Sequence, residues 1–193
     1  MNKLSRADLL TLEAYHEQRA EMRRTVLAHK ANRKVYIGAH AGLYFEDRLT
    51  IQYQIQEMLR VEKIFAAAAI AEELEAYNPL IPDGDNLKAT FMLEYTDVAE
   101  RQTALASLRG VEHKVWLAVG AEPRVLAIPD EDLERADADK TAAVHFLRFQ
   151  LSAAHVAAFK QGAAVTFGID HAAYHDEATL TPAVRAALAA DLD

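Results

Sequence analysis

The stretch that divides this chain is residues 78–86, Asn78-Pro79-Leu80-Ile81-Pro82-Asp83-Gly84-Asp85-Asn86. Its two prolines and its Asp-Gly turn end a helical pattern that runs without glycine or proline from Leu49 to about Tyr77. After the stretch, apolar and polar residues alternate over residues 88–95, which is typical of a β-strand with one buried face. The stretch therefore separates a helical half of the chain from a half built of short strands.

The same patterns predict the elements on either side of this boundary. Before it, apolar residues at helical spacing predict a helix over about 6–29, and short apolar runs at 35–37 and 43–45 predict a hairpin. After it, we expect helices at 98–108, 152–161 and 182–190 and strands at 115–119, 124–128, 143–151 and 164–169. The acidic residues 130–139 predict a helix or a loop, and the polar residues 170–177 a connection to the last helix.

A chain of 193 residues has room for one ordinary domain and little room for two. We therefore expect a single α+β domain over 1–193, in which a helical N-terminal half with two long helices packs on a mostly antiparallel sheet with short crossover helices. Its parts are a helical half with a short hairpin (1–77), a mostly antiparallel half (87–175) and a C-terminal helix (176–193).

Composition excludes several classes of function. The chain has no cysteine, which excludes disulfides, a catalytic thiol, a cysteine-ligated iron–sulfur cluster and a zinc ribbon. No apolar stretch approaches the roughly 20 residues that span a bilayer, and the N-terminus lacks the order of a secretory signal, so we expect a cytoplasmic protein without a membrane partner. The net charge of −8 makes nucleic acid an unlikely partner. Five Lys or Arg residues between Arg23 and Lys34 still leave open an anion- or RNA-binding module, although a solvated helix face explains them as well.

Three ionisable residues fall in apolar registers and are candidate metal ligands. Glu62 lies near the centre of the apolar stripe of the long helix, so we expect it to be buried or at an interface. His113 and His145 are in phase with apolar residues of two expected strands. Two imidazoles and a carboxylate that face one interior would match a non-haem iron, manganese or zinc site, with the three side chains within about 5 Å of one another. The alternative is structural: core histidines with hydrogen-bond partners, and Glu62 paired with Arg48 or Arg148.

A second cluster of titratable residues follows the last expected strand. His171 and His175 are four residues apart among carboxylates, so a helical turn there would let the two imidazoles share a cation. The loop with His171 and Tyr174 could also cover the site of the other ligands, because loops after strands often carry function. A polar connection without a function is the alternative.

Three segments of the chain carry a resemblance to a known family. They are FEDRLT at 45–50 with QIQEMLRVE at 54–62, NPLIPDG at 78–84 with LKAT at 87–90, and KTAAVHFLRF at 140–149 with GIDHAAY at 168–174. Together they resemble the bacterial domain-of-unknown-function family 3501 over nearly the whole chain up to about Tyr174. The family name implies no activity, and whether the chain is an enzyme stays open. Family context implies a setting beside rubrerythrin-like proteins and iron–sulfur oxidoreductases.

The leading hypothesis from the sequence is therefore an accessory protein of a peroxide- or oxygen-linked redox system, linked to oxidative stress, which acts through protein–protein contact. Its expected partner is a rubrerythrin-like or iron–sulfur redox protein. The alternatives are a non-haem metal-binding oxidoreductase with ligands from Glu62, His113, His145 and His171, and an anion- or RNA-binding module.

Overall fold

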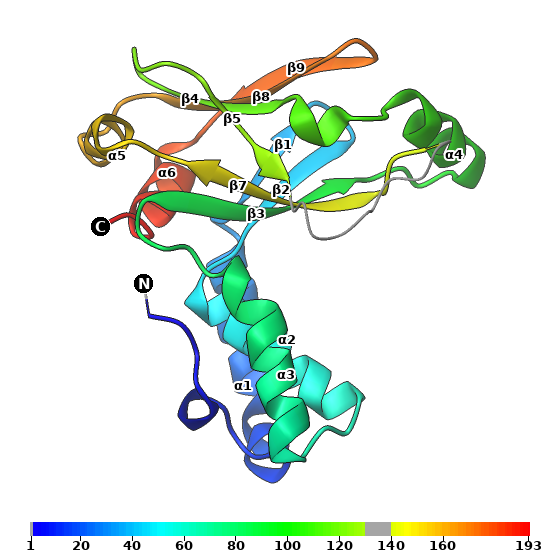
Figure 1. Cartoon of the computed structure of the whole chain (residues 1–193), viewed down its shortest axis with the longest axis vertical. Helices are drawn as coiled ribbons and strands as arrows, with labels where there is room; N and C mark the ends of the chain where they lie inside the picture. Colours follow the sequence, from blue (N-terminus) through cyan, green and yellow to red (C-terminus); the bar gives the residue numbers. More distant parts are fainter. Residues whose placement is uncertain (1, 130–139) are drawn as a thin grey trace.

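The structure is a computed structural model that describes residues 2–129 and 140–193. It has two antiparallel sheets and several helices, which confirms the predicted α+β class. Helices α1, α2 and α3 project from the sheets as a helical lobe (Figure 1). The helical N-terminal half is confirmed only in part, because β1 and β2 belong to a sheet. The expected element at 130–139 lies outside the described residues.

The first sheet, sheet A, has the strand order β1-β2-β3-β7-β6 with antiparallel neighbours. Its strands are β1 (Lys34–Ile37), β2 (Ala41–Phe45), β3 (Asn86–Leu93), β7 (Val144–Gln150) and β6 (Ile128–Pro129). The second sheet, sheet B, has the order β5-β4-β8-β9. Its strands are β5 (Val125–Leu126), β4 (Val115–Val119), β8 (Val165–His171) and β9 (Tyr174–Thr179).

The inner faces of the two sheets share one apolar core. Phe167 of β8 lies at its centre, with ring centroids 5.1 Å from Phe45 of β2 and 5.2 Å from Phe149 of β7. The alternation predicted for residues 88–95 has its cause here, because Leu87 and Phe91 of β3 are fully buried in this core while Lys88 lies on the outer face. The outer face of sheet A is therefore free to carry polar and charged side chains.

The helices fall into two groups. Those of the lobe are α1 (Leu12–Lys30), α2 (Arg48–Val61) and α3 (Ala67–Tyr77), with the short 3-10 helices η1 (Arg6–Asp8) and η2 (Asn78–Leu80). Those beside the sheets are α4 (Val98–Ser107), α5 (Ala153–Lys160) and α6 (Pro182–Ala189), with the 3-10 helix η3 (Val111–His113). The lobe has a separate apolar core, in which Ile55 and Leu59 of α2 pack with Ile70 and Leu74 of α3.

Two predicted helices have different bounds. The helix expected over 49–77 is interrupted, because Glu62 caps α2 and Lys63 takes a left-handed backbone with φ +56°. The amide of Ile64 then donates back to the carbonyl of Leu59 at 2.9 Å, a bond that closes a helix end. The helix expected over 6–29 begins only at Leu12, with Thr11 as its N-cap, and a capping box of Ser5 and Asp8 belongs to the separate helix η1.

Residues 170–177 form a hairpin, so the prediction of a polar connection or helical turn there is wrong. β8 continues to His171 and β9 begins at Tyr174, with Asp170 opposite His175 in the register. The hydroxyl of Tyr174 donates to the carbonyl of Ile37 at 2.6 Å, which ties β9 to the end of β1. The tertiary contact explains why a sequence rich in charged residues forms a strand here.

A buried ionic cluster joins the lobe to α6 and to sheet A. The guanidinium of Arg33 forms an ion pair with Asp191, and both side chains are only 2% exposed. The same guanidinium lies 3.3 Å from the carboxylate of Asp47, the N-cap of α2. His29 of α1 lies 2.5 Å from the same Asp47 carboxylate. Burial raises the pKa of Asp191, although the hydrogen bond from Arg33 opposes that rise. This cluster fixes the position of the lobe relative to the sheets.

Candidate functional site

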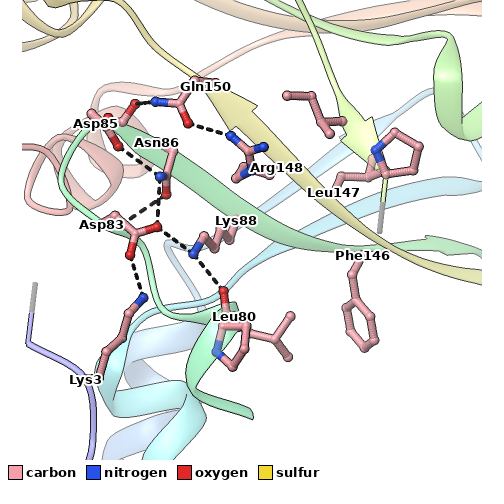
Figure 2. Close-up of a pocket in the computed structure, with 13 residues that line it drawn as sticks. Lys3, Leu80, Asp83, Asp85, Asn86, Lys88, Phe146, Leu147, Arg148 and Gln150 are labelled. Atoms are coloured by element: carbon pink, nitrogen blue, oxygen red, sulfur yellow. Dashed lines mark hydrogen bonds and ion pairs between the residues drawn. The ribbon is translucent and has the colours of Figure 1, made fainter. Parts of the chain in front are cut away.

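A pocket of about 820 Å³ lies where the lobe meets the outer face of sheet A (Figure 2). The outward side chains of β3 and β7 form its floor, Pro79 and Leu80 of η2 form one wall, and Ile128 and Pro129 of β6 form another. Lys3 reaches it from the N-terminal segment. Small-molecule sites in proteins occupy about 300 to 1,000 Å³, so this pocket has the size of a ligand site.

Lys88 of β3 is a structural cation of this pocket. Its ammonium donates to the carbonyls of Pro79 at 2.7 Å and Ile81 at 2.8 Å, and to the carboxylate of Asp83 at 2.7 Å. An ammonium has three N–H donors, and all three have an acceptor. Burial lowers the pKa of Lys88 below its usual value, against the effect of Asp83. Lys88 thus holds η2 against the sheet and pairs with the carboxylate of Asp83.

Asp83 collects the remaining polar groups at this end of the pocket. It accepts a hydrogen bond of 2.6 Å from Lys3 and one of 3.0 Å from the amide of Asn86, which also donates to Asp85. Burial acts to raise the pKa of Asp83, but the hydrogen bonds from Lys3, Lys88 and Asn86 prevail and lower it below the ordinary value. The polar end is therefore closed by its own hydrogen bonds (Figure 2).

Arg148 of β7 is a cation of the pocket that no carboxylate of the described residues pairs with. It lies directly opposite Lys88 in the β3–β7 register, and opposite Ile128 in the register with β6. Its Nη1 donates to the side-chain carbonyl of Gln150 at 2.5 Å, and the Gln150 amide donates to the carbonyl of Asp85. Within residues 2–129 and 140–193 no carboxylate forms an ion pair with Arg148. Like charges directly opposite each other across two strands destabilise a sheet.

The other side of the pocket is apolar. Leu80, Pro129 and Phe146 line it, together with Ile128, which is 36% exposed. In Figure 2 the ring of Phe146 lies on the far side of Arg148 from the Asp83 group. The guanidinium of Arg148 lies at the polar end of the pocket, where it bonds to Gln150.

Glu62 was expected to be buried or at an interface, and the structure shows that it is not buried. Glu62 is the exposed C-cap of α2. The prediction assumed that the helix and its apolar stripe continue past Glu62, but α2 ends at Val61. The alternative pairings are also absent among the described residues, since Arg48 pairs with Asp8 and Arg148 bonds to Gln150.

Of the two strand histidines, His145 is buried as expected and His113 is not. His145 is 4% exposed, and its Nε2 lies 3.0 Å from the Thr141 hydroxyl and 3.8 Å from the carboxylate of Glu112. His113 lies in η3 before β4, where strand periodicity does not apply, and its side chain is 63% exposed. His145 and Glu112 therefore form a buried polar contact that sequence patterns did not single out.

His171 lies at the β8–β9 turn, where its Nε2 is 3.1 Å from the carbonyl of Arg109. His175 lies on β9 with its side chain 80% exposed, 3.3 Å from Asp170. No three His, Asp or Glu side chains in the described parts of the chain are arranged to hold a metal ion. Metal binding stays a prediction, which elemental analysis of the protein purified without a tag or chelator would test.

The basic run at Arg23 to Lys34 does not form one surface. Arg23 and Arg24 are exposed on α1, and Arg24 pairs with Glu21. Arg33 is directed inward to Asp191. The run therefore combines solvated helix positions with a buried structural arginine.

The end of the lobe exposes apolar side chains. Val61, the last residue of α2, is 56% exposed, and Phe65, in the link to α3, is 81% exposed. Large apolar residues that protrude together are a common mark of an interaction surface. We call Val61 and Phe65 the lobe tip. Within the described residues, no helix is both long and apolar enough to cross a membrane.

These features define a class of protein: an α+β fold of two antiparallel sheets and a helical lobe, with a ligand-sized pocket between lobe and sheet. The chain belongs to the family described as protein of unknown function, DUF3501, whose model matches residues 3–192. A protein of unknown function from Burkholderia pseudomallei K96243, known from a crystal structure, is similar, with 52% sequence identity, a TM-score of 0.94 and coverage of 100% of each chain. No curated protein matches the sequence. The family resemblance is thereby confirmed and extends beyond Tyr174.

Proposed function

We propose that this protein binds a small anion in the pocket, through the guanidinium of Arg148. The observation that carries the proposal is the cross-strand pair of Lys88 and Arg148, in which Asp83 pairs with the first cation and no described carboxylate pairs with the second. A bound anion would supply the missing charge and relieve the repulsion between the two strands.

The hydrogen bonds around Arg148 support this role. A guanidinium has five N–H donors, and the described residues provide one acceptor for Arg148, the side chain of Gln150. Gln150 is itself held by the carbonyl of Asp85, so the guanidinium is oriented before a ligand arrives. Arginine binds carboxylate and phosphate groups in a bidentate fashion, which makes either group a suitable ligand.

The test is urea unfolding in sodium phosphate, sodium acetate and sodium chloride at equal ionic strength. The fluorescence of Trp116, the single tryptophan, monitors the unfolding. The wild-type protein should be stabilised by phosphate or acetate with a saturable dependence, by about 2.7 kcal/mol at 100 times the dissociation constant. Arg148→Met should abolish this dependence. Arg23→Met, which removes an exposed arginine from α1, should retain it. Anion-dependent stabilisation that persists in Arg148→Met would refute the proposal.

The lobe tip favours a second function, an accessory protein that contacts a redox partner. The exposed side chains of Val61 and Phe65 are the observation in its favour. The family context implies the partner, a rubrerythrin-like or iron–sulfur protein of a peroxide- or oxygen-linked system. Contact through the tip would leave the pocket open to its ligand, so the two functions are compatible.

Co-expression tests this second function. The chain should elute together with a rubrerythrin-like protein in gel filtration, and Val61→Ser with Phe65→Ser should separate the two. Leu126→Ser, which changes a side chain of similar exposure on sheet B, should leave the complex intact. Clean separation of the co-expressed wild-type pair would count against the accessory role.

A further inference from the structure

We infer that a second site, on the outer face of sheet A, binds a quaternary ammonium group. It consists of Tyr36 on β1, Tyr44 on β2 and Glu94, which follows β3, and we call it the tyrosine corner. Strands β1, β2 and β3 are neighbours in the sheet, which brings the three residues together (Figure 1). None of them lines the Arg148 pocket, so the inference does not depend on the anion-binding function proposed above.

The two tyrosine rings form the walls of the corner. Their planes lie at 84° to each other, with the ring centroids 6.2 Å apart. Gly42 lies opposite Tyr36 in the β1–β2 register. A Cβ at Gly42 would lie 2.9 Å from Cε2 of Tyr44, 3.4 Å from Cε1 of Tyr36 and 3.2 Å from a carboxylate oxygen of Glu94. The three side chains therefore converge over a residue without a side chain, where a larger residue would separate them.

Glu94 supplies a negative charge beside the two rings. Its carboxylate oxygens accept hydrogen bonds of 3.0 and 3.1 Å from the hydroxyl of Tyr44, which lies 3.0 Å from the hydroxyl of Tyr36. Because the single hydroxyl proton of Tyr44 is directed to Glu94, Tyr36 is the donor to Tyr44. Burial, with the neighbouring Tyr36 and Glu94, raises the pKa of Tyr44, which keeps this donor protonated. Over residues 2–129 and 140–193, no Lys, Arg or His forms an ion pair with Glu94.

The chain already places one cation near the corner. The ammonium of Lys34 lies 5.6 Å from the centroid of the Tyr36 ring, which is within the range of a cation–π contact. This contact indicates that the ring attracts positive charge. The side chain of Tyr36 is 47% exposed, so a cation from solvent can also reach it.

A quaternary ammonium group suits these surroundings better than other cations. Aromatic side chains recognise such groups through the negative faces of their rings. A bare ammonium is compact and strongly hydrated, so it gives up more hydration on binding. A metal ion prefers three or more His, Asp or Glu ligands, and the described residues contain no such group. Free choline and a trimethyllysine side chain present the same trimethylammonium group, so the corner is suited to either source.

The experiment is a ¹H–¹⁵N NMR titration of the full-length chain at constant ionic strength. The probes are choline, ammonium chloride, a short trimethyllysine peptide and 3,3-dimethylbutan-1-ol, the neutral isostere of choline. Choline should bind at least about 5-fold more tightly than ammonium and than the neutral isostere, with shift changes at the amides of β1, β2 and Glu94. The relative affinities of choline and the peptide distinguish the two sources of the group.

Four variants test the assignment of the residues. Glu94→Gln and Tyr36→Ala should each weaken choline binding by at least about 5-fold, whereas Tyr36→Phe, which keeps the ring, should retain most of it. Lys34→Met should strengthen binding by about 2-fold or more, because it removes a competing cation. Glu177→Gln, which neutralises an exposed carboxylate on β9, is the matched control and should not change it. Tyr36→Leu replaces Tyr36→Ala if the latter does not fold.

Three results would overturn the inference. The first is no binding of choline or of the peptide to the wild-type chain. The second is binding of the neutral isostere or of ammonium as tight as that of choline, because the site would then recognise either shape alone or charge alone. The third is choline binding that persists unchanged in both Glu94→Gln and Tyr36→Ala, because the bound cation would then lie elsewhere on the surface.

Discussion

Arg33→Met should be among the most damaging single substitutions in this protein. The Arg33 guanidinium pairs with Asp191, lies 3.3 Å from Asp47, and donates to the backbone carbonyls of Phe45 and Glu46 at 3.3 and 3.2 Å. Methionine fills a similar volume but offers no donor and no charge. The variant therefore leaves two buried carboxylates without their main cation.

The expected loss follows from the cost of an unpaired buried charge. Removal of one partner from a buried ion pair destabilises a protein by about 3 to 5 kcal/mol, whereas the whole free energy of unfolding of a domain is about 5 to 15 kcal/mol. We expect a loss of about 4 kcal/mol at neutral pH. Since burial already raises the pKa of Asp191, and the variant removes the opposing cation, the carboxyl should take up a proton more readily in the folded state. The loss should therefore be smaller at pH 5 than at pH 8.

Urea unfolding followed by Trp116 fluorescence measures this loss. In the Arg33→Met background, Asp191→Asn should recover about 1 kcal/mol or more, because it removes one of the unpaired charges. Arg24→Met on the exposed side of α1 is the matched control and should change the free energy of unfolding by less than about 0.5 kcal/mol. A loss below about 1 kcal/mol for Arg33→Met, or a double variant less stable than Arg33→Met alone, would refute the reasoning.

Three further predictions concern packing, pH and a tertiary hydrogen bond. A Cβ at Gly168 would lie 2.1 Å from Cζ2 of Trp116, so Gly168→Ala should displace the indole, red-shift its emission and cost about 1 to 3 kcal/mol in urea unfolding. Hydrogen bonding from Arg19 lowers the pKa of Glu57 to about 2, so the stability that Glu57 provides above its unfolded pKa should fall between pH 5 and pH 2, and Glu57→Gln should flatten that part of the pH profile of the urea midpoint. Tyr174→Phe leaves two backbone partners at the β1–β2 turn without the hydroxyl and should cost about 1 to 2 kcal/mol, measured by the same unfolding; no change would mean that water replaces the hydroxyl.

The local signals in the sequence predicted much of the fold. Asp47 caps α2, Ser152 caps α5 and Thr181 caps α6, each by accepting a hydrogen bond from a backbone amide of the first turn, as such residues before a helical pattern indicate. The boundary at residues 78–86 separates the lobe from β3 as predicted. These features depend on neighbours within a few positions, which a single sequence displays directly.

The parts that could not be predicted depend on distant contacts. β9 is a strand because it pairs with β8 and because Tyr174 bonds to Ile37, 137 positions away. The break at Lys63 had no glycine or proline to mark it. Arg148 becomes a candidate site residue only when the strand registers are known, because these place it opposite Lys88 of β3 and Ile128 of β6. Its outward position on β7 was readable as alternation, but the strand order that forms the pocket was not.

The ionic cluster at Arg33 also has a consequence for synthesis on the ribosome. Arg33 and Asp191 are 158 positions apart. At about 5 to 20 residues per second, Arg33 is translated about 8 to 30 seconds before its partner. During that interval the lobe and the β1–β2 hairpin can form, but the guanidinium between them has only Asp47 as a nearby carboxylate in the cluster and must stay hydrated. The nascent chain therefore passes through a period in which the contacts of Arg33 with Phe45, Glu46 and Asp47 can form, while its ion pair with Asp191 waits for the last residues of the chain.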